Sequence, residues 1–414
     1  MDNELQTAIS RIKSGVAPGH AAIVGDMTLG INFLAEFWET NYLSKYIPCG
    51  GNRIQFITGR QGSGKTHMIE YLLSRAGGGD SVGGNSAVGH YKIASFSARK
   101  IWVHDFKEIF FEVLRQCDLE DCLSRCAREV VKSLGFDPND FDGRFIDYLA
   151  SKGQNDPITK REIRLQLNQM FLHNPLIDNN FACACALLTG GQLGHPLLEE
   201  PAREALLGWL SGRKDVKLAF LRSLGLSPVR IAKNNARHML RSLVEVVKMA
   251  GYDGVIIAVD DLDILVSSDS MDEIRYTRLK REDAYESLRE LIDEIDTLRN
   301  VFFLFAFDRK LIDDDKYGVK SYQALWFRMQ NEIRSERINR FSNMIDLDKL
   351  PVYDVRFIME LSARVARLVN TTEERPAQPL DEGAAVALLS KAGFGEIALP
   401  RKVILATIGQ KVDE

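Results

Sequence analysis

The sequence predicts an α/β protein whose core is a parallel β-sheet covered by helices on both faces. Two runs of apolar residues, at 255–259 and 301–307, are continuous rather than alternating, which is typical of strands buried on both sides. Segments with helical spacing of apolar residues lie between the predicted strands. Such alternation of strands and helices is typical of a parallel sheet.

The chain divides into five predicted segments. Residues 1–50 are expected to form two helical stretches joined at VAPGH, and 51–134 the first half of the core. Residues 135–235 are interpreted as a helical insertion, because Pro and Gly break them into short pieces and none alternates at period two. Residues 236–350 complete the core, and 351–414 form a small helical lid.

In the first half of the core, a strand at 53–58 is followed by a helix at 66–75. The Gly- and Ser-rich stretch 77–89 is expected to be a mobile loop. Residues 91–98 alternate as a strand does, and 106–134 are expected to be helical.

In the second half, a long helix at 234–250 precedes the first apolar run, and a helix at 284–298 follows it. The second apolar run extends to a strand at 301–308. Residues 320–340 are expected to be helical, and 343–350 to hold a short last strand.

Composition is ordinary for a globular protein, with 45% hydrophobic and 27% charged residues among 414. The net charge of −4 and the pI near 6.1 argue against a protein that coats nucleic acid over its whole surface, although a local basic groove stays open. No run approaches the roughly 18 apolar residues that cross a bilayer, and the polar start MDNELQTAISRIKSG lacks the apolar centre of a secretory signal. We therefore expect a cytoplasmic location and no membrane partner.

The six cysteines fit no paired CxxC zinc site. Cys122 and Cys126 have helical spacing with no histidine close in sequence. We expect buried or inert thiols rather than metal or redox use.

The run GRQGSGKT matches the pattern G-x-x-x-x-G-K-[ST] at every fixed position and lies between a predicted strand and a predicted helix. The glycines let backbone N–H groups converge on phosphates, and the start of the helix adds positive potential there. A chance Gly-rich turn is the alternative, and motif and context together argue against it. The predicted nucleotide-binding residues are Gly59, Arg60, Gln61, Gly62, Ser63, Gly64, Lys65, Thr66 and His67.

Within this motif, Lys65 is expected to reach the β- and γ-phosphates, and the Thr66 hydroxyl to coordinate Mg²⁺. A carboxylate for the metal is expected at the end of a neighbouring strand. The apolar run 255–259 puts Asp260 there, and we assign it to the metal shell, directly or through water.

Two further acids follow in the cluster DDLD. Asp261 is the candidate base for the attacking water, and Asp263 is the reserve candidate. The alternative is that one or two of these acids only cap the segment that follows. This alternative is strongest for Asp263. Asp308 ends the next strand, where a polar side chain could position the lytic water; a turn-forming Asp-Arg pair is the other interpretation.

Arginines are the candidates for contacts to the γ-phosphate. Arg334, Arg337 and Arg340 share one face of the helix expected there, and Arg340 is our favoured arginine finger toward a neighbouring subunit. Solvated surface charge is the alternative for each. Near the carboxyl end, Pro400 suits the first turn of a helix, which would aim Arg401 back toward the core as a second phosphate-sensing arginine; a plain helix-start charge is the alternative.

Taken together, these motifs resemble the AAA+ and related STAND-like P-loop ATPases. More specifically, the chain resembles the BREX-type ATP-binding proteins of bacterial phage defence. The segments that carry this likeness span roughly residues 10–408 and are RIKSGVAPGH, GRQGSGKTHMIEYL, ALLGWLSG, GYDGVIIAVDD, SYQALWFRMQNEI and LPRKVI. DDLD departs from the commoner Asp-Glu pair, which leaves the rate of hydrolysis open.

The resemblance implies an ATPase that uses Mg²⁺ and acts as a motor or switch in a multi-protein defence system. Expected partners are other defence-system proteins, with DNA as a candidate, and we expect a homo-oligomer because an arginine finger acts across subunits. The alternatives are an ATP-gated DNA-binding or loading factor and a regulatory NTPase that nucleates a signalling complex. About a dozen residues follow Arg401, too few for a winged-helix domain, so sequence-specific DNA reading by that route is not expected. No base-contacting motif separates ATP from GTP.

Overall fold

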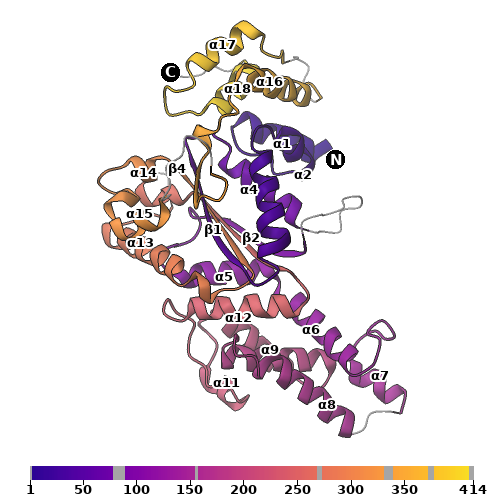
Figure 1. Ribbon diagram of the computed structural model, residues 1–414. Helices are drawn as coiled ribbons and strands as arrows, with labels where there is room; N and C mark the ends of the chain where they lie inside the picture. Colours follow the sequence, from indigo (N-terminus) through magenta and orange to yellow (C-terminus); the bar gives the residue numbers. More distant parts are fainter. Residues whose placement is uncertain are drawn as a thin grey trace.

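The computed structural model describes residues 2–77, 89–153, 157–267, 273–330, 339–371 and 377–409 (Figure 1). Its centre is a five-stranded sheet in the order β2-β3-β4-β1-β5, and every neighbouring pair is parallel. The strands are β1 (Asn52–Gly59), β2 (Tyr91–Ser97), β3 (Gly254–Asp260), β4 (Val301–Asp308) and β5 (Met344–Asp346). The predicted α/β class with a parallel sheet is therefore confirmed.

Both faces of the sheet are covered, and the side chains of β4 show why its sequence is apolar throughout. Phe303, Phe305 and Phe307 pack into the hydrophobic core formed with α5 (Phe106–Cys117), α12 (Ala236–Met249) and α13 (Arg278–Asp293). Phe302, Leu304 and Ala306 pack into the opposite core, with α3 (Asn32–Trp38), the π-helix Glu39–Tyr46 and α4 (Lys65–Ala76). Because successive side chains of a strand alternate between faces, a strand buried on both sides reads as one continuous apolar run.

The region between α5 and α12 consists of helices joined by turns, with no strand among its described residues, and it lies beyond α12, at the bottom of Figure 1. Its elements are α6 (Leu119–Ser133), α7 (Phe145–Ser151), α8 (Pro157–Leu167), the π-helix Asn168–Leu172, α9 (Asn179–Leu193), α10 (Glu200–Leu210) and α11 (Leu218–Ser223). The single helix predicted for 106–134 is wrong. Asp118 takes a left-handed conformation with φ of 50° and its side chain caps α6, which separates α6 from α5.

The two chain ends share a core at the other end of the sheet (Figure 1). The carboxyl-terminal helices are α16 (Val355–Val369), α17 (Glu382–Ser390) and α18 (Leu399–Thr407), which we call the C-terminal unit. They pack against α1 (Asp2–Lys13) and α2 (Ala21–Met27) through residues such as Ile12, Val365 and Val403. The prediction of two amino-terminal helical stretches missed that the second is divided into α2, α3 and the π-helix.

Some predicted boundaries shift. The helix expected at 320–340 is only α15 (Gln323–Met329), after which Gln330 is extended; residues 331–338 lie outside the described residues. The helix expected at 284–298 is α13, which begins earlier, followed by the 3-10 helix Ile295–Thr297. The other short elements are α14 (Lys310–Asp313) and the 3-10 helices Leu262–Val266, Val319–Ser321 and Leu347–Lys349. Most of the loop expected at 77–89 falls on residues 78–88, which are not described.

One position on the outer edge of β2 is covered by a side chain. Gln116 of α5 accepts a hydrogen bond from the amide of Ser95 at 2.8 Å and donates one to its carbonyl at 3.1 Å. At this residue the side-chain amide takes the place of a partner strand. In the described part of the chain, no helix combines the length and the apolar character needed to cross a membrane.

Candidate functional site

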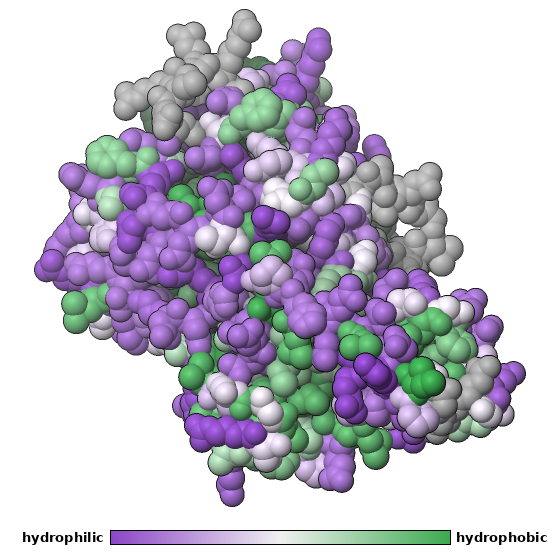
Figure 2. Space-filling view, turned by 60° about the horizontal axis from the view of Figure 1, so that its bottom comes forward, coloured by the Kyte–Doolittle hydropathy of each residue, from purple (hydrophilic) through white to green (hydrophobic). Residues whose placement is uncertain are grey.

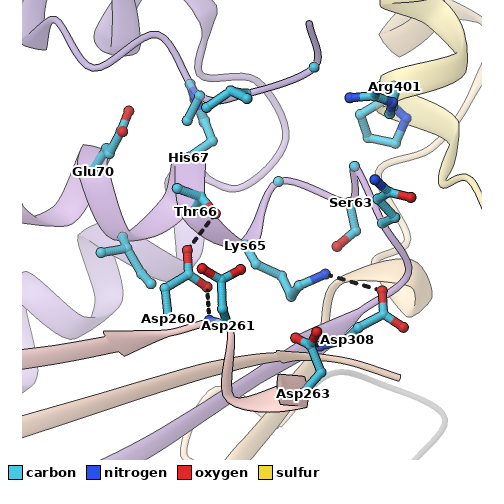
Figure 3. Close-up of a pocket in the computed structure, with 18 of the residues that line it drawn as sticks. Ser63, Lys65, Thr66, His67, Glu70, Asp260, Asp261, Asp263, Asp308 and Arg401 are labelled. Atoms are coloured by element: carbon cyan, nitrogen blue, oxygen red, sulfur yellow. Dashed lines mark hydrogen bonds and ion pairs between the residues drawn. The ribbon is translucent and has the colours of Figure 1, made fainter. Parts of the chain in front are cut away.

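A cavity of about 1460 Å³ opens where the strands of the sheet end (Figure 3). The loop between β1 and α4 forms one wall, and the acidic residues after β3 and β4 form the floor. The segment after α1 and the first turn of α18 complete it. Parallel sheets bring the carboxyl ends of their strands to one edge, so residues far apart in the sequence meet here.

The loop at residues 59–66, which we call the glycine-rich loop, requires its glycines. Gly62 and Gly64 have φ of 79° and 96°, values that L side chains rarely adopt. A Cβ on Gly62 would also lie 2.3 Å from the Arg401 Cβ, and one on Gly59 would lie 2.4 Å from the Ser63 Oγ. The Ser63 Oγ is itself buried without a hydrogen-bond partner among the described residues, so a phosphate oxygen could satisfy it.

Lys65 points from the start of α4 along the inside of this loop. Its Nζ donates to the carbonyls of Gly59 at 2.8 Å and Arg60 at 3.0 Å. It also lies 3.7 Å from a carboxylate oxygen of Asp308 (Figure 3). The ammonium group is therefore held between the loop and the end of β4.

Thr66 and Asp260 join the loop to the neighbouring strand. The Thr66 hydroxyl donates to an Asp260 carboxylate oxygen at 2.5 Å, and the other oxygen accepts from the Asp261 amide at 2.8 Å (Figure 3). Burial, and then the adjacent Asp261 charge, raise the pKa of Asp260 to about 6. A hydroxyl and a carboxylate are hard oxygen ligands of the kind that Mg²⁺ prefers, so these two residues fit the ion.

Residues at the carboxyl end of β2 position the side chain of Asp261. Its φ of 58° is left-handed, and its carboxylate accepts from the Ser97 hydroxyl at 2.5 Å. The Arg99 Nε lies 3.7 Å from the same carboxylate. The sequence did not mark Ser97 and Arg99, and the available signal was their place at the carboxyl end of the predicted strand at 91–98.

Asp263 faces inward and bridges two strand ends. One oxygen accepts from the Asp308 amide at 2.9 Å, and the other accepts from Arg99 at 3.0 Å. Burial raises the pKa of Asp263. Neither contact goes to the segment that follows Asp263, so they are not the capping contact of the alternative interpretation; Asp263 instead connects the end of β4 to Arg99. Asp308 has features of both its interpretations, because one oxygen accepts from the Lys310 amide in a turn while the other faces Lys65.

Arg401 lies on the first turn of α18 and covers the glycine-rich loop (Figure 3). Its aliphatic stem packs on Gly62, and its Nη1 donates to the Ser14 carbonyl at 3.2 Å. The guanidinium thus reaches the segment after α1, at the rim of the cavity.

Arg60 joins the glycine-rich loop to the C-terminal unit. Its guanidinium donates to the carbonyls of Ala392 at 2.8 Å and Gly395 at 3.1 Å, and to the Asp348 carboxylate at 3.3 Å. The next residue, Gln61, accepts from the Ala398 amide at 2.9 Å. No sequence signal marked Arg60 for this contact, because the motif leaves its position free.

His67 and Glu70 line the wall where α4 meets the amino-terminal segment. Burial lowers the pKa of His67 to about 4, so the ring is neutral at pH 7. Thr28 lies 2.9 Å from its Nε2 and donates its own proton to the Val24 carbonyl, so the Nε2 carries the hydrogen. Glu70 accepts from the Gly19 amide at 2.9 Å. The apolar residues that complete this end of the cavity include Ile12, Val16, Met27, Tyr353, Phe357 and Ile404.

The favoured finger arginine does not line the cavity. Arg340 is exposed in a turn before β5, not on a helix as predicted, and its guanidinium lies 5.4 Å and 5.9 Å from the rings of Phe33 and Phe37. Arg334 and Arg337 lie outside the described residues.

No three His, Cys, Asp or Glu residues in the described ranges come together as a metal site. A divalent ion beside Asp260 would therefore need further ligands from a phosphate and from water. Burial raises the pKa of Cys117 and Cys126 to about 12, which keeps both thiols protonated, whereas Cys49 is exposed.

Comparison with known proteins adds a family. A model of the family described as BREX system ATP-binding protein BrxC/D matches residues 99–409. The match begins after the glycine-rich loop and includes Asp260, Asp308 and Arg401. No curated protein and no solved structure matches the chain. Because the match covers most of the sequence, the chain belongs to the family of BREX system ATP-binding proteins BrxC/D.

Proposed function

We propose that the protein binds ATP with Mg²⁺ in this cavity and hydrolyses it as a motor or switch of a bacterial anti-phage defence system. The observation that carries the proposal is the contact between Thr66 and Asp260, with Lys65 in the same cavity. The hydroxyl and the carboxylate lie where one ion could bind both, and the ammonium lies where phosphates would follow.

The chain's own residues have separable roles in this proposal. Backbone amides of the glycine-rich loop and the Lys65 ammonium bind the phosphates, and Thr66 with Asp260 would hold Mg²⁺. The ion, when bound, neutralises phosphate charge. Asp261 takes a proton from the attacking water, and Asp308 orients that water. Arg401 is placed to approach the phosphates from α18.

The apolar end of the cavity supports a site for the base. Phe357 and Ile404 come from the C-terminal unit, and Tyr353 lies just before it. Ile12 belongs to α1 and Val16 to the loop that follows α1. Binding a flat base between them would bury apolar surface on both sides. ATP bound there would then contact both chain ends at once.

The contacts of Asp261 favour a slow switch over a fast motor. The Ser97 hydroxyl and the nearby Arg99 compete with the attacking water for the oxygens of this carboxylate. Aspartate is also one carbon shorter than the glutamate that is commoner at this position. Slow turnover fits a protein that regulates the assembly of other defence-system proteins.

Lys65→Ala tests the proposal, with Lys349→Ala as the matched control because Lys349 is 71% exposed on its side chain and does not line the cavity. Calorimetry with Mg·ATP and a phosphate-release assay are the measurements. We expect wild type and the control to bind and turn over ATP, and Lys65→Ala to lose on the order of 10²-fold in kcat/KM. Wild-type turnover by Lys65→Ala would sink the catalytic assignment, and absence of binding heat in wild type would sink the site.

A further inference from the structure

The segment 213–230 differs in charge from the rest of the chain. It contains five cations, Arg213, Lys214, Lys217, Arg222 and Arg230, and one anion, Asp215, for a net charge of +4. The whole chain carries −4, so the remaining residues carry −8. The net charge of the whole chain therefore hides one segment that is strongly positive.

The fold gathers these cations. The Arg230 guanidinium donates to the carbonyls of Lys214 at 3.1 Å and of Arg213 and Val216 at 3.4 Å. The indole of Trp209 donates to the Val229 carbonyl at 2.9 Å, which holds the second half of the segment in place. The two ends of the segment therefore lie side by side.

The helix α11 begins directly after Lys217 and carries Arg222 in its last turn, so it projects from the joined ends with a cation at each of its own ends. In Figure 1 it lies at the end of the molecule opposite the C-terminal unit. The gathered cations are thus remote from the glycine-rich loop.

The side chains of Lys214, Lys217 and Arg222 are exposed, and none forms an ion pair with another described residue. Arg213, in contrast, is paired with both Glu204 and Asp215. Two apolar side chains are exposed among the unpaired cations: Phe220 is 40% and Val229 is 57% exposed. Figure 2, which looks at the molecule from this end, shows hydrophilic residues interspersed with apolar ones.

We propose that this surface, the basic face formed by Lys214, Lys217, Phe220, Arg222 and Arg230, binds the sugar–phosphate backbone of nucleic acid. Unpaired cations on an otherwise acidic molecule attract a polyanion to one place and orient it. An exposed aromatic ring among them can stack on an unpaired base. The six residues of α11 make too short an amphipathic surface for a membrane. The inference does not depend on ATP hydrolysis.

The test is a pair of charge-reversed proteins. Lys217→Glu with Arg222→Glu removes the centre of the basic face. Lys152→Glu with Arg161→Glu makes the same change of charge at two exposed positions, one directly after α7 and one in α8. Fluorescence anisotropy with a labelled 30-nucleotide DNA strand and its duplex measures Kd at several salt concentrations. Thermal melting serves as a check that both proteins fold, and it does not depend on ATP hydrolysis.

We expect the basic-face variant to bind at least tenfold more weakly in about 0.1 M salt, while the control stays within about twofold. The slope of log Kd against log salt should fall by about two with duplex, one for each lost phosphate contact. Phe220→Ala should weaken the single strand and spare the duplex if the ring stacks on a base. Equal losses in both variants, no wild-type binding at low salt, or tighter binding to phosphatidylserine vesicles than to either DNA would overturn the proposal.

Discussion

The ionised carboxylate of Asp260 costs the folded protein free energy. It is enclosed beneath the loop, its neighbour Asp261 carries the same charge, and the compensating donors are the Thr66 hydroxyl and one amide. A cation at this position would relieve both the burial and the repulsion. The local geometry thus favours a bound cation.

Asp260→Asn should therefore stabilise the protein when divalent ions are absent. The pKa of Asp260 is raised from 3.8 to about 6 in the folded state, so ionising it costs folding free energy. The cost appears as pH rises from about 4 and is complete above about 6. With EDTA at pH 8, thermal melting should show a gain on the order of 2 kcal/mol, which should vanish near pH 4.

The same variant should bind Mg·ATP poorly, because an amide is a weaker ligand than a carboxylate. Asp263→Asn is the matched control, since Asp263 is also enclosed and near Arg99 but does not contact Thr66. A lower melting temperature for Asp260→Asn with EDTA at pH 8 would contradict this account of the carboxylate.

At the scale of elements, the glycine-rich loop is bonded to the C-terminal unit before any nucleotide enters. Arg60 holds the turn between α17 and α18 by two carbonyls, and Gln61 pairs with the backbone just before α18. The helix that carries Arg401 is thus attached to the loop that Arg401 covers. Movement of one should move the other.

Arg60→Ala should loosen this attachment. Hydrogen exchange of amides 392–398 should accelerate, because the carbonyls of Ala392 and Gly395 lose their donor. Affinity for ATP should fall by about tenfold, the effect of losing one or two charge-assisted hydrogen bonds. Arg367→Ala, at an exposed position of α16, is the control. Unchanged exchange at 392–398 would show that Arg60 is not the attachment.

The strands were the most predictable elements, and the reason is visible in β4. Its two buried faces leave an unbroken apolar run, which gave its limits correctly, and the same holds for most of β3. The break at Asp118 was not predictable, because helical periodicity continues from α5 into α6 while one left-handed residue turns the chain. The length of α15 was overestimated. The spacing of apolar residues is compatible with a longer helix, but the backbone of Gln330 is extended and ends it.

For the molecule as a whole, the motif residues converge as the strand order requires, but the contacts that hold them come from remote parts of the sequence. Asp261 depends on Ser97, Arg60 on Gly395 and Glu70 on Gly19. Ser97, Gly395 and Gly19 are common residue types, and no short sequence pattern specifies their positions. Motifs therefore predicted which side chains meet, whereas their supports required the fold.

At the scale of the whole molecule, one question is whether Arg340 acts on a neighbouring subunit. Arg340 is exposed and lies away from its own cavity, so it is accessible to a neighbouring subunit. If it acts there as an arginine finger, Arg340→Ala should lower turnover on the order of 10³-fold. Asp261→Asn should be inactive as well, and mixing the two proteins should restore part of the phosphate release because each supplies what the other lacks.

Failure of the mixture to exceed its separate components at any ratio would argue against a finger in trans. The control mixes Asp261→Asn with Lys65→Ala. Both changes lie on the nucleotide-binding side of a subunit, so this mixture should recover nothing.

The two hydrogen bonds of Gln116 affect how a second chain could pair with β2. Because the Ser95 amide and carbonyl are both occupied, a foreign strand added along this edge would meet no free backbone partner at the middle of β2 unless Gln116 moved away. The side chain of Gln116 thus acts against extension of the sheet by another molecule at the β2 edge.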